Sequence, residues 1–199
     1  MFIIGITGGT GAGKTSAMNA LRSFGAGLLD CDEIYHELLQ NNHEMQSEIE
    51  SRFENVTADN KIDRKKLGEK VWNNPDALND LNKITHKYIS TEIDKRLKAI
   101  SDKDGKVAAI DAIALIESGQ SEKCNIIIGI TAPKEMRITR ITARDNITKE
   151  QALLRINAQQ TEEFYKDRCD FILENTFESQ EKFGEVCKEF FKNLINNGR

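Results

Sequence analysis

Short apolar runs alternate along the chain with stretches in which apolar residues recur about every 3.6 positions. The continuous runs are typical of strands buried on both faces of a parallel sheet. The periodic stretches are typical of helices, and the last one places Phe183, Cys187 and Leu194 on one face, which we interpret as core. The alternation predicts an α/β fold in which helices cover both faces of a five-stranded parallel sheet. The expected strands are residues 2–7, 27–29, 106–111, 125–131 and 170–174.

The strand signal is weak between the second and third expected strands. Apolar side chains there fall at helical spacings, and Asn74, Pro75 and Asp76 are typical of a helix start. An α/β crossover does not need so many residues. We therefore expect an all-helical, substrate-binding insertion at 33–101, while 1–32 and 102–199 form the core domain.

Residues 8–15, between the first strand and the first helix, read GGTGAGKT and fit the pattern G-x-x-x-x-G-K-[ST]. Glycines let backbone N–H groups close around phosphate oxygens, and the positive end of the following helix points to the same place. Lys14 has the reach for the outer phosphates, and the Thr15 hydroxyl is a Mg²⁺ ligand in such loops. The motif predicts a three-layer α/β/α P-loop NTPase core. Its triphosphate-binding residues are Gly8, Gly9, Thr10, Gly11, Ala12, Gly13, Lys14, Thr15 and Ser16.

Carboxylates and arginines accompany this loop. Asp30 and Asp32 follow the second strand, at the edge where open parallel sheets bind ligands. Arg137, Arg140 and Arg144 are three and four positions apart, so they share one helix face. Such a face is either solvated or belongs to a lid that closes over the triphosphate.

We interpret the arginine helix as part of a helical lid at about residues 134–166. The sequence from Thr148 to Gln151 is a capping box, which predicts a second lid helix that runs to about Lys166. Loop, carboxylates and lid are the parts of a small-molecule kinase, in which catalysis is mostly positioning and charge neutralisation.

The net charge and the composition of the chain limit the kinds of binding partner that we expect. The 199 residues have a net charge of −4, which argues against a nucleic-acid-binding surface. No apolar run approaches the length of a membrane span. The four cysteines include no C-x-x-C pair and are typical of reduced thiols in a cytoplasmic protein. We expect a cytoplasmic monomer that acts on a small molecule, with no nucleic-acid or membrane partner.

Further motifs make the chain similar to one family over nearly its whole length. After the phosphate loop come D-x-D at Asp30, D-R-x-x-L at Asp63 and R-x-x-x-R-D at Arg140. In this order the motifs resemble those of the dephospho-coenzyme A kinases. The matching positions are 5–15, 29–32, 62–64, Leu67, Val71, Trp72, His86, Ile89, 115–117, Arg140, Arg144, Asp145, Gln159 and 170–175.

The resemblance implies ATP-dependent phosphorylation of the ribose 3′-hydroxyl of dephospho-coenzyme A, the last step of coenzyme A biosynthesis. It also implies a nucleotide-monophosphate-kinase-like core with a helical coenzyme A domain and a lid. Asp32 matches the family's general base, and a carboxylate can accept a proton that is lost late in the transfer. Asp32 could instead cap the following helix.

The resemblance, together with the position of each residue, predicts the functions of the remaining site residues. Lys14 and Arg140 act with Asp32 in catalysis, and Arg144 and Asn175 join the loop in binding ATP. Mg²⁺ is held by Thr15 and, at the end of the third strand, by Asp111. The acceptor is bound by Thr7, Asp32, Arg64, His86 and Glu117.

Two stretches depart from the family pattern. Lys87 follows His86 where the family has Pro, and residues 113–117 begin with Ile113 and Ala114 where the family has Pro-Leu-Leu-Phe-Glu. In the family this second segment lines the acceptor pocket. The alternatives are therefore a P-loop kinase for another nucleotide or nucleoside, or a nucleotide-binding regulatory module without phosphoryl transfer.

Overall fold

A computed structural model describes residues 1–58, 61–71 and 74–197 of the chain. Trp72, one of the positions that carry the family resemblance, lies outside the described residues. The chain divides into two compact units, one formed by 1–29 with 100–199 and the other by 30–99.

The first unit is built on a five-stranded sheet with the strand order β2-β5-β1-β6-β7. The N-terminal strand β1 is central and pairs in parallel with β5 and β6. Its register places Asp111, the last residue of β5, opposite Ile6. The sheet that was predicted from the apolar runs is confirmed, with strands β1 Phe2–Thr7, β2 Gly27–Asp30, β5 Val107–Asp111, β6 Ile126–Thr131 and β7 Phe171–Glu174.

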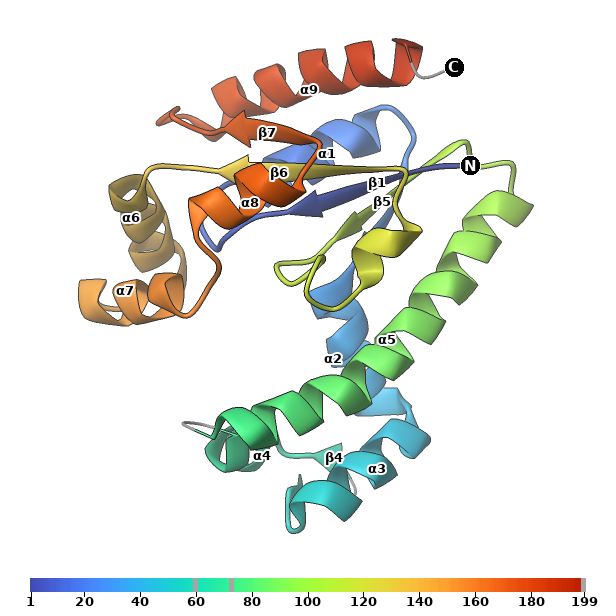
Figure 1. The fold of residues 1–199 in the computed structure, drawn as a ribbon, viewed down its shortest axis with the longest axis vertical. Helices are drawn as coiled ribbons and strands as arrows, with labels where there is room; N and C mark the ends of the chain where they lie inside the picture. The colour runs from blue at the N-terminus through green and yellow to red at the C-terminus, as the bar shows by residue number, and fades with distance from the viewer. Residues whose placement is uncertain (59–60, 72–73, 198–199) are drawn as a thin grey trace. The chain divides into compact units, whose positions relative to one another are not determined.

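Helices cover the sheet on both faces (Figure 1). Helix α1, Lys14–Ser23, packs against α9, Gln180–Asn197. Their shared core includes Leu21, Phe183 and Phe191, all fully buried against β1 and β6. Helix α8, Glu162–Arg168, contacts β6 and β7, and a short 3₁₀ helix, Gln120–Lys123, precedes β6.

Helices α6 Lys134–Asp145 and α7 Lys149–Asn157 lie where the sequence predicts a lid, and we refer to that segment as the lid. The two helices share a small core of Ile138, Ile141, Ala152 and Ile156. The capping box is confirmed, because Thr148 and Gln151 each bond the other's backbone N–H. The expectation of one helix as far as Lys166 is wrong. The chain leaves α7 after Asn157, and Thr161 caps the separate helix α8 by accepting from the Phe164 N–H at 3.2 Å.

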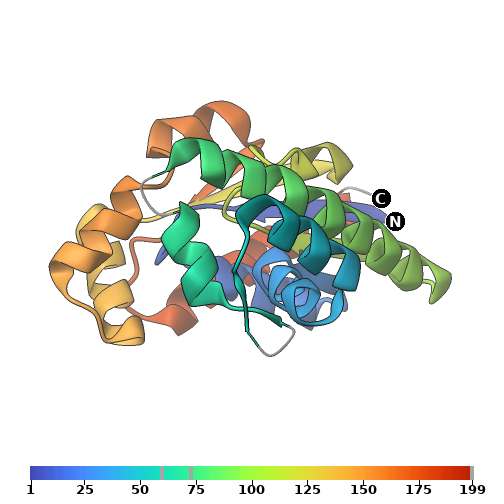
Figure 2. The same cartoon turned by 90° about the horizontal axis from the view of Figure 1, so that it is seen from below.

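In the described residues, the second unit contains four helices and a short hairpin. These elements are α2 Cys31–Asn41, α3 His43–Phe53, β3 Thr57–Ala58, β4 Lys61–Ile62, α4 Arg64–Val71 and α5 Pro75–Asp102. The expected start of α5 is confirmed, because the Asn74 side chain accepts from the Ala77 N–H at 3.1 Å. The long course of α5 can be followed in Figure 2.

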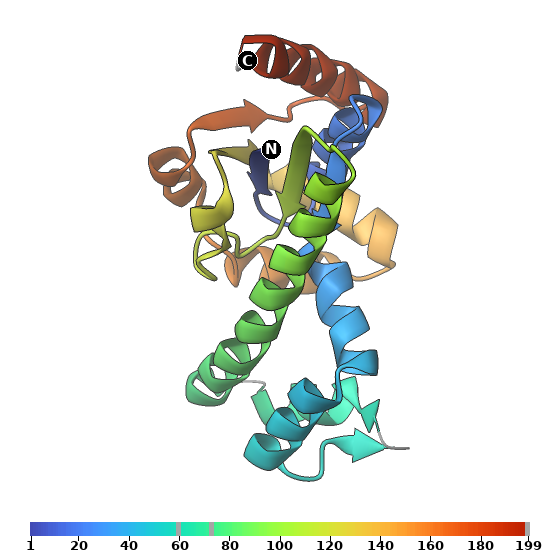
Figure 3. The same cartoon turned by 90° about the vertical axis from the view of Figure 1, so that its right-hand side faces the viewer.

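The expectation of an all-helical insertion is wrong, because β3 and β4 form an antiparallel pair, visible in Figure 3. Positive φ angles at Glu54 and Asn55, 44° and 57°, turn the chain out of α3. Val56 and Ile62 then enter the core between α3, α4 and α5. Strands of two residues are too short for a period-2 pattern, so tertiary packing and not local sequence produces this hairpin.

None of the helices in the described residues has the length and apolar character of a membrane span. No disulfide joins any of the four cysteines, and Cys31 and Cys187 are buried.

We expect Cys124 and Cys187 to react slowly with iodoacetamide in the native protein. Burial raises the pKa of both thiols to about 12, so at pH 8 only about one thiol in ten thousand is the reactive thiolate. Mass spectrometry of alkylated peptides, with and without urea, measures the difference. Equal rates in the folded and unfolded chain would contradict the burial of these thiols.

Candidate active site

Three glycines of the phosphate loop have backbone conformations that other residues rarely adopt. The φ angles are 139° at Gly8, 78° at Gly11 and 114° at Gly13. Space is also short, because a Cβ on Gly8 would lie 2.1 Å from the Ile130 carbonyl oxygen. The loop therefore has a shape that depends on glycine at these positions, as the motif predicted.

The carbonyl oxygens of this loop are all held by hydrogen bonds. Cationic side chains provide three of the donors: Lys14 Nζ to Gly8 at 3.1 Å, Arg137 Nε to Thr10 at 2.9 Å and Arg140 Nη1 to Gly11 at 3.1 Å. Asn175 Nδ2 donates to Ala12 at 2.8 Å. The remaining two oxygens, of Gly9 and Gly13, accept from the backbone N–H groups of Ala12 and Ser16.

This arrangement has a direct consequence for anion binding. Successive carbonyl oxygens that are turned toward protein donors leave loop N–H groups other than those of Thr10 and Ala12 for a bound anion. Helix α1 begins at Lys14, and the N–H groups of its first turn have no partners inside the helix. The loop and the helix start together form a phosphate-binding cradle.

Lys14 and Asp111 lie beside each other at the end of this cradle. Lys14 Nζ is 4.0 Å from Asp111 Oδ1, and the two side chains are only 13% and 14% exposed. Thr15, the next residue of α1, is exposed. A hydroxyl and one carboxylate fit Mg²⁺, which takes its other ligands from phosphates and water. The described residues contain no cluster of three His, Cys, Asp or Glu side chains that could hold a metal ion.

Arg140 is the most extensively bonded of the lid arginines. Besides Gly11, its guanidinium donates to Asn175 Oδ1 at 3.2 Å and to the Phe177 carbonyl oxygen at 2.6 Å. Burial lowers the pKa of Arg137 and Arg140, the first two members of the predicted arginine face. These two arginines face the loop and are not a solvated surface.

Arg144 is placed differently from the other two arginines. It is exposed and forms an ion pair with Asp145 at 2.7 Å, which raises the pKa of Arg144. Asp145 also pairs with Arg155 of α7. The structure therefore separates Arg144 from the residues that bond the phosphate loop.

Thr10 was expected in the cradle, yet its polar groups are bonded to the lid. Its N–H donates to Gln159 Oε1 at 2.9 Å, and its hydroxyl oxygen accepts from Gln159 Nε2 at 2.6 Å. Gln159 appeared in the sequence only as a position of family resemblance. Its function as a loop contact was missed, because no local sequence pattern places a residue beside another that is 149 positions away.

The segment after β5 is hydrogen-bonded to Thr7, the residue directly before the phosphate loop. The buried Thr7 hydroxyl donates to the Ile113 carbonyl oxygen at 3.0 Å, so Thr7 contacts the segment that departs from the family pattern. Glu117, further along the same segment, is exposed.

The other predicted residues belong to the second unit. Asp30 is the cap of α2, because its carboxylate accepts from the N–H groups of Asp32 and Glu33 at 2.9 and 3.1 Å. Asp32 itself is exposed in the first turn of α2 and is not the cap. Arg64 is exposed at the start of α4, and His86 is half-buried within α5.

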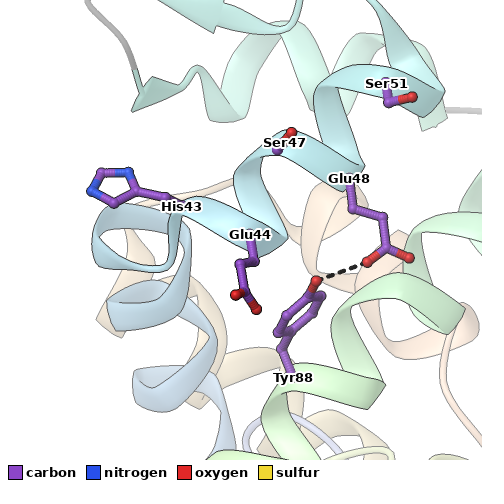
Figure 4. Close-up of a pocket in the computed structure, with 6 residues that line it drawn as sticks. All are labelled: His43, Glu44, Ser47, Glu48, Ser51 and Tyr88. Atoms are coloured by element: carbon purple, nitrogen blue, oxygen red, sulfur yellow. Dashed lines mark hydrogen bonds between the residues drawn. The ribbon is translucent and has the colours of Figure 1, made fainter.

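A surface groove between α3 and α5 is lined by none of the predicted site residues (Figure 4). Tyr88 donates its hydroxyl to Glu48 Oε2 at 2.9 Å, and Lys87 Nζ donates to the same oxygen at 2.8 Å. These bonds lower the pKa of Glu48. Lys87, which replaces the family's Pro, thus makes a contact inside the helical unit. The groove is lined by His43, Glu44, Ser47, Glu48, Ser51 and Tyr88.

A central parallel strand that leads into a phosphate loop, with lid arginines bonded to that loop, defines the class of P-loop kinases. Shikimate kinase from Bacteroides thetaiotaomicron has the same fold, with a TM-score of 0.54 over 98% of both chains at 13% identity. Residues 2–181 match the model of the dephospho-CoA kinase family, CoaE. The chain belongs to the dephospho-CoA kinase family.

Individual relatives agree with the family match. The dephospho-CoA kinase of Dehalococcoides mccartyi is 40% identical over 164 residues, which are 81% of this chain and 82% of the relative. The solved dephospho-CoA kinase from Campylobacter jejuni superposes with a TM-score of 0.72 at 31% identity. That alignment covers 99% of this chain and 98% of the other.

We expect His86 to make the protein less stable in mild acid. Burial holds the pKa of His86 below its ordinary value, so the unfolded chain binds the proton more readily. The free energy of unfolding therefore falls as the pH drops below the unfolded-state pKa of about 6.5. Urea unfolding of His86→Gln should show a smaller loss between about pH 7 and pH 5 than the unaltered protein. His43→Gln, at an exposed position, is the matched control, and an unchanged loss in His86→Gln would contradict the expectation.

Proposed function

We propose that this chain transfers the γ-phosphoryl group of ATP to the ribose 3′-hydroxyl of dephospho-CoA, giving CoA and ADP. This is the last step of CoA biosynthesis. The observation that carries the proposal is the phosphate loop, whose carbonyl oxygens are all bonded to protein donors in a member of the dephospho-CoA kinase family. A cytoplasmic, monomeric enzyme is part of the same proposal.

The loop and its cations bind the triphosphate. Loop N–H groups other than those of Thr10, Ala12 and Ser16, which donate to protein acceptors, contact the phosphate oxygens together with the start of α1. Lys14 neutralises charge on the outer phosphates. One Lys14 hydrogen remains on the Gly8 carbonyl, and the others are directed to the nucleotide. Arg140 makes three hydrogen bonds, and its remaining N–H groups place positive charge beside the loop. Arg144 and Asn175 complete the ATP site on the lid and after β7.

Thr15 and Asp111 would hold Mg²⁺ in this site. The ion supplies charge neutralisation and orientation at the phosphates when it is bound. The Lys14 ammonium lies 4.0 Å from the Asp111 carboxylate, so the two opposite charges meet at the edge of the cradle.

Asp32 acts as the general base toward the acceptor. The 3′-hydroxyl oxygen forms a bond to the γ-phosphorus while the bond to the bridging oxygen breaks and its electron pair leaves with ADP. Asp32 takes the hydroxyl proton late in this transfer. Because Asp30 caps α2, the carboxylate of Asp32 is not needed for that structural task. Thr7, Arg64, His86 and Glu117 bind the acceptor.

We expect Asp32→Asn to retain ATP binding and to lose about 10²- to 10⁴-fold in kcat, because only the proton acceptor is removed. Coupled detection of ADP, with isothermal titration of ATP, measures the two effects. Glu33→Gln, the exposed neighbour on α2, is the matched control. Near-normal turnover of Asp32→Asn would contradict the assignment of the base.

We expect Lys14→Ala to reduce both ATP affinity and kcat, because the ammonium interacts with the triphosphate before and during transfer.

The coupled detection of ADP with adenosine, AMP and other nucleosides as acceptors tests the identity of the substrate. Faster turnover of one of these than of dephospho-CoA would identify a kinase for another acceptor. ATP binding without transfer to any of them would indicate a regulatory module.

A further inference from the structure

One residue of the phosphate loop is held by the lid at every polar atom. Thr10 receives a hydrogen bond from Arg137 at its carbonyl oxygen, and Gln159 binds both its N–H and its hydroxyl. A backbone N–H that donates to Gln159 is not available to a phosphate. Thr10 is therefore an anchor point of the loop and differs from the residues around it.

Arg137 and Gln159 act on Thr10 as one unit. Arg137 Nη2 donates to Gln159 Oε1 at 2.8 Å, the same oxygen that accepts from the Thr10 N–H. Arg137 comes from α6, and Gln159 comes from the connection after α7, so two separate parts of the lid meet at one loop residue. Removing either side chain leaves the other with an incomplete set of partners.

Gly9, the residue before Thr10, shows how closely Arg137 and Gln159 approach the loop. A Cβ on Gly9 would lie 2.2 Å from Arg137 Nη2 and 3.0 Å from Gln159 Oε1. Positive φ angles occur at Gly8, Gly11 and Gly13, and Gly9 is outside that group. A side chain at position 9 would therefore meet the guanidinium of Arg137, whereas the backbone angle there does not call for glycine.

The partners of Arg137 indicate that this residue positions the loop and does not itself neutralise charge on the substrate. Its hydrogen bonds go to a backbone carbonyl and to a neutral side-chain amide. Both bonds fix the guanidinium against the outside of the loop, on the carbonyl edge opposite to the N–H edge that binds an anion.

We propose that Arg137 and Gln159 are positioning residues that hold the loop in its phosphate-binding shape before ATP arrives. The inference rests on the proposed binding of ATP, but not on the identity of the acceptor. A preformed loop binds its ligand without the cost of ordering it first, so the two residues contribute to nucleotide affinity. They link the lid and the loop, and a lid that moves away releases Thr10.

The test uses Arg137→Met and Gln159→Met, which keep an unbranched stem and remove the polar ends of the side chains, and the double variant. We expect each single variant to bind ADP about tenfold more weakly, with a higher KM for ATP and little change in kcat or in the KM for the acceptor. Without nucleotide, hydrogen exchange of the loop amides 8–15 should be faster. The double variant should be little worse than either single one, because both side chains act through Thr10.

Arg155→Met, on the exposed side of α7, is the matched control and should leave binding and exchange unchanged. Arg137→Lys, which retains a donor, should recover part of the affinity. If Arg137→Met leaves loop exchange and ADP affinity unchanged and lowers kcat alone, Arg137 contacts the transferred group and the proposal is wrong. Additive losses in the double variant would also overturn it.

Gly9→Ala provides a second, independent variant. Its methyl group should displace the Arg137 guanidinium and reduce ADP affinity, but should add little once Arg137 is Met. A full additional loss in that background would overturn the proposal. ADP binding and exchange need no acceptor, so failure of the protein to phosphorylate dephospho-CoA would refute the proposed reaction and leave this inference standing.

Discussion

A loop that binds phosphate through its N–H groups must turn its carbonyl oxygens elsewhere, and each of these oxygens then needs a donor. In this protein the side-chain donors come from three places: Lys14 at the start of α1, the lid arginines Arg137 and Arg140, and Asn175 after β7. These elements are far apart in the sequence. The need to satisfy one short piece of backbone therefore explains why they converge at the carboxyl end of β1.

This constraint gives the lid arginines two uses. A guanidinium that bonds a loop carbonyl also places positive charge next to the triphosphate site, so the groups that shape the loop add to its attraction for anions. Arg137 and Arg140 are both placed this way, whereas Arg144 is paired with Asp145. One helix face thus contains residues with different tasks, which their spacing alone does not separate.

The helical unit has an organisation of its own. Its core is assembled from α3, α4, α5 and the hairpin, and Asp30 caps the helix that carries Asp32. The two departures from the family pattern have structural contacts in this protein. Lys87 bonds Glu48 inside the helical unit, and the Ile113 carbonyl accepts from Thr7 in the core unit. The substituted side chain makes the bond at Lys87, whereas at Ile113 the bond is to the backbone.

Much of this protein could be predicted from its sequence, because the relevant signals are local. Continuous apolar runs predicted the five strands, glycine spacing predicted the loop, and Asn74 with Pro75 predicted the start of α5. The hairpin at Thr57–Ala58 and Lys61–Ile62, the break before α8 and the partners of Thr10 could not be predicted in this way. They depend on buried side chains and hydrogen bonds between residues as many as 149 positions apart. The sequence by itself determined the strands of the sheet and the phosphate-binding motif, since propensity and periodicity act over a few residues. Only the tertiary structure decided which donor satisfies which loop carbonyl, since that depends on packing between distant segments.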